Sequence, residues 1–264
     1  GHGCHAASPE GVLSFIVVQA ITGLASAASL FLIAVGLSIV FGVTRVVNFA
    51  HGSLYMLGAY LAFSFTAAFG DTFFGYLAAI LLAAVVVGGL GAVMETSLLR
   101  RIYRAPELFQ LLATFGVVLV VQDLTRMIWG ADDLFAPRMP GLDGAINIFG
   151  HAVPEYDLFL IATAFVVLGG LWLLFRHTRF GVLVRAATED REMVAALGID
   201  QRWLFTGAFI LGAALAGLGG ALQIPRQAAS LSMDLNIIVD AFVVVVVGGM
   251  GSIMGAFVAA VLIS

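Results

Sequence analysis

The sequence contains no lysine and few charged residues of either sign. All twelve basic residues are arginine, and charged residues make up 11% of the 264 residues, against roughly 25% in an ordinary soluble domain. A P-loop ATPase and a Schiff-base enzyme each need a lysine, so the chain can perform neither reaction itself. The single cysteine, Cys4, permits no internal disulfide bond. The formal net charge of −4 is too small to indicate nucleic-acid binding.

Long apolar runs dominate what is present, and 61% of the residues are hydrophobic. A bilayer core about 30 Å thick requires roughly 20 apolar residues of helix. Seven stretches between charged residues meet or approach this length: residues 11–44, 46–70, 72–94, 108–122 with a continuation to 130, 158–175, 203–225 and 241–264. The sequence therefore predicts an all-α, polytopic transmembrane bundle with about seven spans, in a single membrane domain over residues 1–264.

The arginines indicate which way the spans run, because short arginine-rich loops tend to stay in the cytoplasm. One cluster, Arg100, Arg101 and Arg104, follows the third stretch, and five more arginines fill the connection at 176–202. Placing both in the cytoplasm predicts an external N-terminus. The acidic segment 132–157 then becomes an external loop, which its prolines and glycines suit.

Two of the predicted spans contain residues that disturb a regular helix. The second carries Asn48, His51 and Gly52 near its start, and the seventh contains the glycines Gly248, Gly249 and Gly251. We expect broken or re-entrant helices at both places, with the three glycines as a hinge. The chain ends at Ser264 inside an apolar run, which predicts a further C-terminal segment beyond it.

The connection at 176–202 contains the pattern of a short helix. Thr188 is a good N-cap, acidic residues follow it in the first turn, and glycine, as at Gly198, is favoured just after the C-terminal end of a helix. Met193, Ala196 and Leu197 fall on one face by their spacing. A short helix with one apolar face predicts docking on a partner, and the alternative is a helix lying on the lipid surface.

Three runs of the sequence resemble branched-chain amino acid ABC transporter permeases. Residues 185–199 resemble the coupling-helix loop of that family, and 247–255 resemble its glycine-rich turn near the C-terminal end. Residues 46–60, with the run Asn48-Phe-Ala-His51-Gly52, resemble the signature of the H-type subunit. The likeness extends in order and spacing from about Leu13 to Ser264, and family members normally continue for several tens of residues further.

The resemblance implies a permease subunit of an ATP-driven importer for branched-chain or other hydrophobic amino acids, in the bacterial inner membrane. Its partners would be a second permease (M-type, or a second copy), two cytoplasmic ATPases that hold ATP and Mg²⁺, and an external substrate-binding protein. The chain itself would be no enzyme and would bind no cofactor. Residues that would couple it to the ATPase are Arg185, Thr188, Glu189, Asp190, Arg191, Glu192, Met193, Leu197 and Gly198.

Polar groups in apolar segments are the candidates for the transport path. They are Asn48, His51, Tyr55 and Gln223, together with Gly52, which follows His51. For His51 a structural alternative is open, in which it caps or braces backbone near Gly52. An importer supplied by a binding protein need not hold its substrate tightly, so a weak and mostly apolar path is physically reasonable.

Other functions remain as alternatives. Permeases for urea, short amides or sugars share this architecture. A secondary transporter or channel could use Asp123, Arg126 and Asp240 to bind ions or protons. A serine hydrolase is excluded, because a nucleophile elbow around Ser252 needs glycines where the chain has methionines. No metal site is predicted, since His2, Cys4 and His5 are too few ligands and too near a free end.

Overall fold

Six helices of the described residues are long and apolar enough to cross a membrane. The computed structural model describes residues 9–103, 105–148 and 151–264, so His2, Cys4, His5 and Arg104 lie outside the described residues. The spanning helices are α1 (Pro9–Thr44), α2 (Ala50–Phe69), α3 (Phe73–Met94) with its extension through a π-helical turn (Glu95–Leu99) and α4 (Arg100–Ile102), α5 (Glu107–Trp129), α6 (Glu155–His177) and α9 (Gln201–Gln223).

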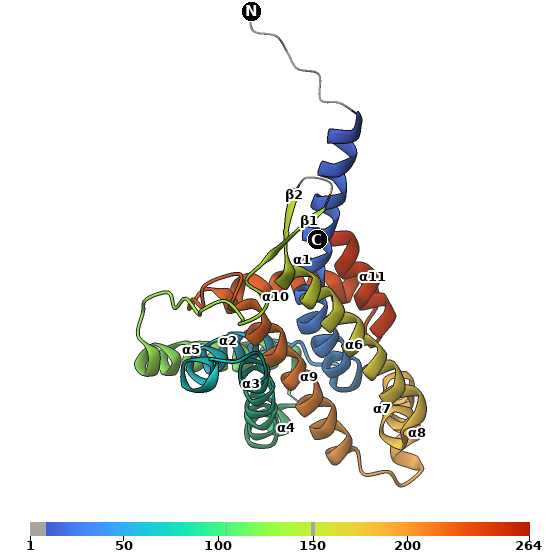
Figure 1. The fold of residues 1–264 in the computed structure, drawn as a ribbon. Helices are drawn as coiled ribbons and strands as arrows, with labels where there is room; N and C mark the ends of the chain where they lie inside the picture. Colours follow the sequence, from blue (N-terminus) through green and yellow to red (C-terminus); the bar gives the residue numbers. More distant parts are fainter. Residues whose placement is uncertain (1–8, 104, 149–150) are drawn as a thin grey trace, which may run out of the picture.

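The remaining elements are short and lie between or after these spans (Figure 1). They are the antiparallel strands β1 (Ala145–Ile148) and β2 (His151–Pro154), and the helices α7 (Arg179–Glu189), α8 (Arg191–Ala196), α10 (Met233–Gly248) and α11 (Ile253–Ile263). The predicted helical bundle is confirmed, and the hairpin is a small addition within the acidic segment 132–157.

The predicted seventh span, 241–264, is wrong as a single helix. Helix α10 starts earlier, at Met233, and ends at Gly248, after which the chain turns and α11 begins at Ile253. Gly249 and Gly251 have φ of 88° and 80°. This left-handed conformation stops a helix and suits glycine, which has no Cβ to clash with the backbone. The break predicted at the glycine hinge is therefore confirmed.

The second expected break includes Asn48 but ends before His51 and Gly52. Helix α1 ends at Thr44, residues 45–49 are not helical, and α2 begins at Ala50. Arg45 has φ of 55°, unusual for a residue other than glycine, and Val46 and Asn48 are buried. Irregular backbone is thus covered by protein, as the interior of a membrane requires. His51 and Gly52 lie within the first turn of an unbroken α2.

Helix α9 forms the centre of the bundle and packs against α1, α2 and α3. The contacts depend on glycine: a Cβ on Gly36 of α1 would lie 2.5 Å from the carbonyl oxygen of Gly212. Gly58 of α2 similarly meets the backbone of Gly217. In lipid the hydrophobic effect does not drive helices together, so small residues that let two backbones approach closely stabilise their packing. Gly212 and Gly217 of α9 therefore serve helix packing within this chain.

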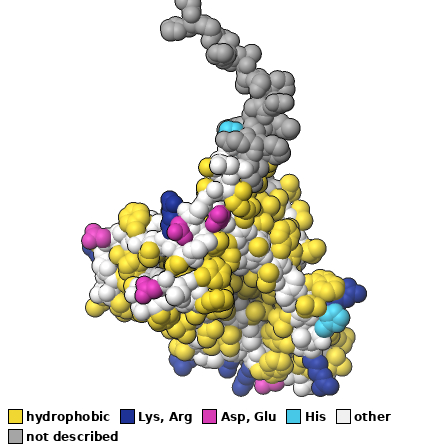
Figure 2. Space-filling view, viewed as in Figure 1, with side chains coloured by type: hydrophobic (Ala, Val, Ile, Leu, Met, Phe, Trp, Pro, Cys, Tyr) yellow, Lys and Arg dark blue, Asp and Glu magenta, His cyan; other side chains and the backbone are white. Residues whose placement is uncertain are grey.

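Charge is distributed unevenly along the bundle. Figure 2 shows arginine side chains along the lower edge, where α4, α7 and α8 lie, and mostly apolar side chains above them. The N-terminal end of α1 lies at the opposite end of the molecule (Figure 1). This separation is what the predicted orientation requires, and the orientation itself stays a prediction.

Candidate coupling segment and transport cavity

The predicted coupling helix consists of two short helices rather than one. Thr188 was expected as its N-cap, but it lies in the last turn of α7, where its hydroxyl donates to the Val184 carbonyl at 2.9 Å. The true N-cap is Asp190, whose Oδ1 accepts a hydrogen bond from the backbone N–H of Met193 at 2.9 Å. Asp190 can act as the N-cap because its backbone is extended, with φ of −144° and ψ of 99°, as the N-cap position requires. Gly198, with φ of 79°, follows the end of α8 as predicted.

The outer face of α8 is apolar and uncovered by the rest of the chain. Met193 is 57% exposed and Leu197 is 71% exposed, whereas Val194 between them is buried. Beside this face lies a hollow of about 670 Å³, lined by Ala195 and by the charged or polar residues Arg45, Glu189, Asp190, Arg191, Glu192 and Gln201. An apolar patch with a polar rim is typical of a protein interaction surface.

Arg191 ties α8 to the spanning helices instead of facing outward. Its guanidinium donates to the Thr44 carbonyl of α1 at 3.1 Å and lies 4.7 Å from the centre of the Phe205 ring of α9. Burial, and then the nearby charge of Arg45, lower the pKa of Arg191. The side chain thus joins α8 to α1 and α9, and its predicted role in orienting an ATPase contact stays a prediction.

The end of α7 also touches the glycine hinge. A Cβ added to Gly251 would lie 2.8 Å from the Cγ2 of Thr188. The N–H of Gly251 donates to the Ser38 hydroxyl of α1 at 3.0 Å, and Gly42 of α1 lies against the same glycine. The structure thus brings together two residues assigned separately from the sequence, Thr188 to coupling and Gly251 to a hinge. Gly249 makes no comparable contact, and Gly248 packs on Gly255 of α11.

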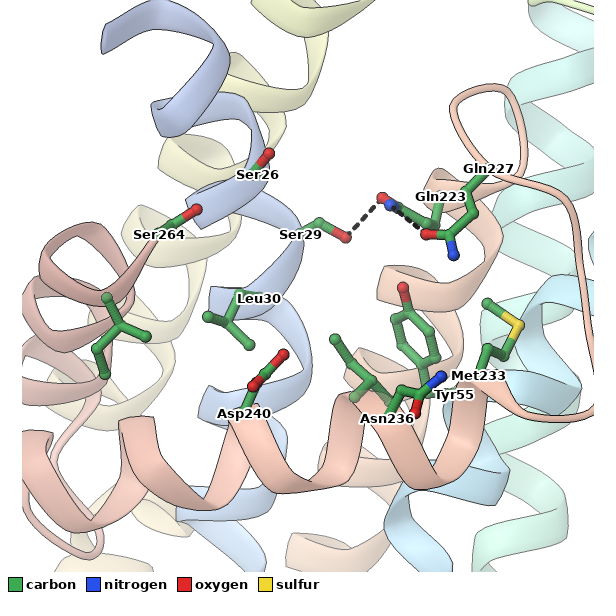
Figure 3. A pocket seen from close by; sticks show the side chains of 12 residues that line it. Ser26, Ser29, Leu30, Tyr55, Gln223, Gln227, Met233, Asn236, Asp240 and Ser264 are labelled. Carbon is green, nitrogen blue, oxygen red and sulfur yellow. Dashed lines mark hydrogen bonds between the residues drawn. The ribbon is translucent and has the colours of Figure 1, made fainter. Parts of the chain in front are cut away.

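A cavity of about 340 Å³ opens among α1, α2, α9, α10 and α11 (Figure 3). Two predicted path residues, Tyr55 and Gln223, line it. The other lining residues were not predicted to belong to the transport path, and Asp240 was named only for the alternative of ion or proton binding. They are Ser26, Ser29, Leu30, Gln227, Met233, Asn236, Ile237, Asp240, Ile263 and Ser264. Ser26 and Ser29 stand three residues apart on an apolar helix, a spacing that places both on one face and is detectable in the sequence.

The other three predicted path residues lie away from this cavity. His51 is 0% exposed and neither ring nitrogen has a hydrogen bond of ordinary geometry, although the Ile33 carbonyl lies near the ring. The Oδ1 of Asn48 accepts from the Ala50 N–H at 3.1 Å, which braces the start of α2. Gly52 packs against the backbone of Asp234. Any role of these three residues in transport stays a prediction.

Asp234 is a buried acidic residue that the sequence-based selection did not include. It is 1% exposed, and it accepts hydrogen bonds from the Ser53 hydroxyl of α2 at 3.1 Å and from the Gln122 side-chain amide of α5 at 3.0 Å. Buried carboxylates require such partners. Asp234 therefore fixes the start of α10 to α2 and α5. Its signal in the sequence is a charge inside a largely apolar stretch.

Replacing Gln122 by leucine should lower the thermal stability of the protein in detergent. The change leaves the Asp234 carboxylate without its amide donor, a loss of about 1–3 kcal/mol for a buried polar group. Gln19→Leu is the matched control, because Gln19 is exposed on α1. Equal unfolding temperatures for the two variants would show that the Asp234 network contributes nothing to stability.

Comparison with known proteins places these features in context. A family model described as a permease component of branched-chain amino acid transport systems matches residues 19–264. The chain is 28% identical to the high-affinity branched-chain amino acid transport permease BraD of Pseudomonas aeruginosa, over 93% of this chain and 83% of that protein. It is 27% identical to LivH of Escherichia coli, over 92% and 82%, and 26% identical to LivM, over 94% and 63%. No solved structure matches.

Proposed function

Because the chain belongs to the family of branched-chain amino acid transport permeases, we propose that it imports branched-chain or other hydrophobic amino acids as the H-type membrane subunit of an ATP-driven transporter. The relatives BraD and LivH, which the chain covers most fully, support the H-type assignment. The relatives above are all named for branched-chain amino acids, which favours these substrates over urea, short amides or sugars. Six apolar helices fit a multi-pass protein of the inner membrane.

The proposed partners follow from the missing lysine and from the exposed apolar face of α8. With no lysine, it has no Walker A residue, so ATP and Mg²⁺ belong on two separate cytoplasmic ATPases. A second permease, of the M-type or a second copy, completes the membrane path, and an external binding protein delivers the amino acid. In this arrangement α7 and α8 face the cytoplasm and the N-terminus lies outside.

The exposed apolar face of α8 is the observation that carries this proposal. Met193 and Leu197 would anchor in a groove of the ATPase, with Arg185, Glu189 and Glu192 at the rim. Nucleotide-driven closure of the ATPases then moves α7 and α8. That movement reaches α1 through Arg191, α9 through Phe205, and the α10–α11 turn through Thr188. Rigid movement of helices around these contacts produces alternating access.

Leu197→Glu in the co-expressed transporter should reduce ATPase copurification several-fold and lower transport in parallel. The substitution places a charge where the proposal buries an apolar side chain, while the exposed position of Leu197 spares the fold. Phe135→Glu is the control, since Phe135 is also exposed but lies in the segment 132–157. Copurification and leucine uptake at the level of the control in Leu197→Glu would contradict the proposal, as would uptake by this chain reconstituted without any ATPase.

A further inference from the structure

Asp240 is an acidic side chain without a partner inside a mostly apolar helix. It lies on the exposed side of α10, and its neighbours Val239 and Val243 are also exposed. Among the described residues its carboxylate forms no hydrogen bond and no ion pair. A charge at such a position is costly in contact with lipid, so Asp240 is expected to face a water-filled cavity. Figure 3 shows that it projects from α10 into the cavity beside α1.

The cavity has the composition of a small-molecule site. Its volume of about 340 Å³ lies within the roughly 300–1,000 Å³ of known ligand pockets. Asp240 is the only charged side chain among the described residues that line it, so this lining has a net negative charge. An ammonium group would compensate this charge.

Hydrogen-bond donors lie across the cavity from Asp240. The amides of Gln223 and Gln227 stand together, with the Ser29 hydroxyl donating to the Oε1 of Gln223 at 3.0 Å (Figure 3). At the same end the guanidinium of Arg226 donates to the Ser26 hydroxyl at 3.4 Å. The Arg226 guanidinium is paired with Asp157 at 3.2 Å, so the side-chain amides, each with two N–H groups, are the donors that suit a carboxylate.

Apolar side chains complete the lining between these two ends. Leu30 comes from α1, and Met233 and Ile237 come from α10. Their surfaces suit a branched aliphatic side chain, whose burial is favourable in proportion to its area. The cavity therefore offers a separate surface for each of the three parts of a zwitterionic, aliphatic amino acid.

We infer that this cavity is a binding subsite for the transported amino acid, in which Asp240 receives the ammonium group and the amides of Gln223 and Gln227 receive the carboxylate. The inference rests on the proposed function and specifies where the transported amino acid binds within the membrane subunit. The cavity lies at the end of the bundle away from α7 and α8, which is the side where a binding protein would deliver the substrate. Only the ammonium group of the substrate would meet a charged side chain of the lining, so binding should be weak enough for the ligand to be released readily.

Photolabelling of the whole transporter with a diazirine analogue of leucine tests this subsite. The labelling is done without the binding protein, so that the specificity of that protein does not enter. We expect labelled peptides from the helices that line the cavity, chiefly α1 and α10, and competition by leucine but much weaker competition by 4-methylpentanoate, which lacks the ammonium group. Asp240→Asn should reduce labelling about tenfold, as expected for loss of a charged hydrogen bond, and Asp240→Glu should retain most of it.

Asp123→Asn is the matched control, because it removes one acidic residue from an exposed position on α5 outside the cavity. Unchanged labelling in Asp240→Asn, equal competition by 4-methylpentanoate, labels confined to other helices, or no labelling of the wild type would each overturn the inference. ATP-dependent leucine uptake by the wild type is measured separately. Uptake that requires the ATPases, with labelling indifferent to Asp240, would reject the subsite alone, whereas labelling at the cavity with uptake independent of ATP would reject the proposed function alone.

Discussion

Gly251→Val is expected to reduce ATP-dependent transport more than about tenfold while ATP hydrolysis by the assembled transporter continues. Two effects act together. Gly251 has φ of 80°, where a residue with a Cβ is strained by about 1–2 kcal/mol. The added side chain would also push against Thr188 of α7 and Gly42 of α1, the point at which the coupling segment touches the α10–α11 turn. Uptake and ATP hydrolysis in proteoliposomes measure the separation of the two activities.

The effect of strain can be separated from the effect of contact by a second glycine in the same turn. Gly249 has φ of 88°, but a Cβ there meets only the Cβ of Ser252, at 3.9 Å. Gly249→Val therefore carries similar strain without the contact to α7, and its transport should fall much less. Adding Thr188→Ser to Gly251→Ala removes the methyl group that lies 2.8 Å away and should restore part of the transport. If both valine variants lose transport equally, the Thr188 contact has no role in coupling.

Gly58→Val is expected to prevent assembly of the bundle. A Cβ at this position would overlap the backbone of Gly217 in α9, and backbone cannot rotate away as a side chain can. Valine is favoured over glycine in a helix interior by less than about 1 kcal/mol. Overpacking costs about 1–3 kcal/mol, and more where helices must separate, so the clash outweighs the gain in propensity. The yield of monodisperse protein in detergent and its unfolding temperature measure the result.

Gly89→Val is the comparison that isolates this contact. Gly89 lies in α3, like Gly58 inside a spanning helix, but a Cβ there meets no atom within 4 Å. We expect its yield and unfolding temperature to stay near those of the wild type. Equal loss in both variants would point to a general intolerance of valine in these helices and would remove the argument for close packing of α2 on α9.

Features governed by neighbouring residues were predictable from the sequence. Apolar runs of sufficient length became helices, because backbone groups in lipid must be paired within the segment. The glycines at 248, 249 and 251 marked the break between α10 and α11, and Gly198 marked the end of α8. Two predictions about helix ends were wrong. Asp190, and not Thr188, is the N-cap of α8. Helix α10 begins before Asp240, because a charged residue need not end a helix.

The sequence by itself determined that this is a helical membrane protein, and where its helices are interrupted, since these follow from composition and short-range backbone rules. Only the tertiary structure decided which residues meet. The pairs Thr188 with Gly251, Asp234 with Gln122, and Ser29 with Gln223 join helices far apart in the chain. Such contacts depend on how helices cross one another. No local pattern encodes that geometry, which is why the cavity around Asp240 appeared only in the folded bundle.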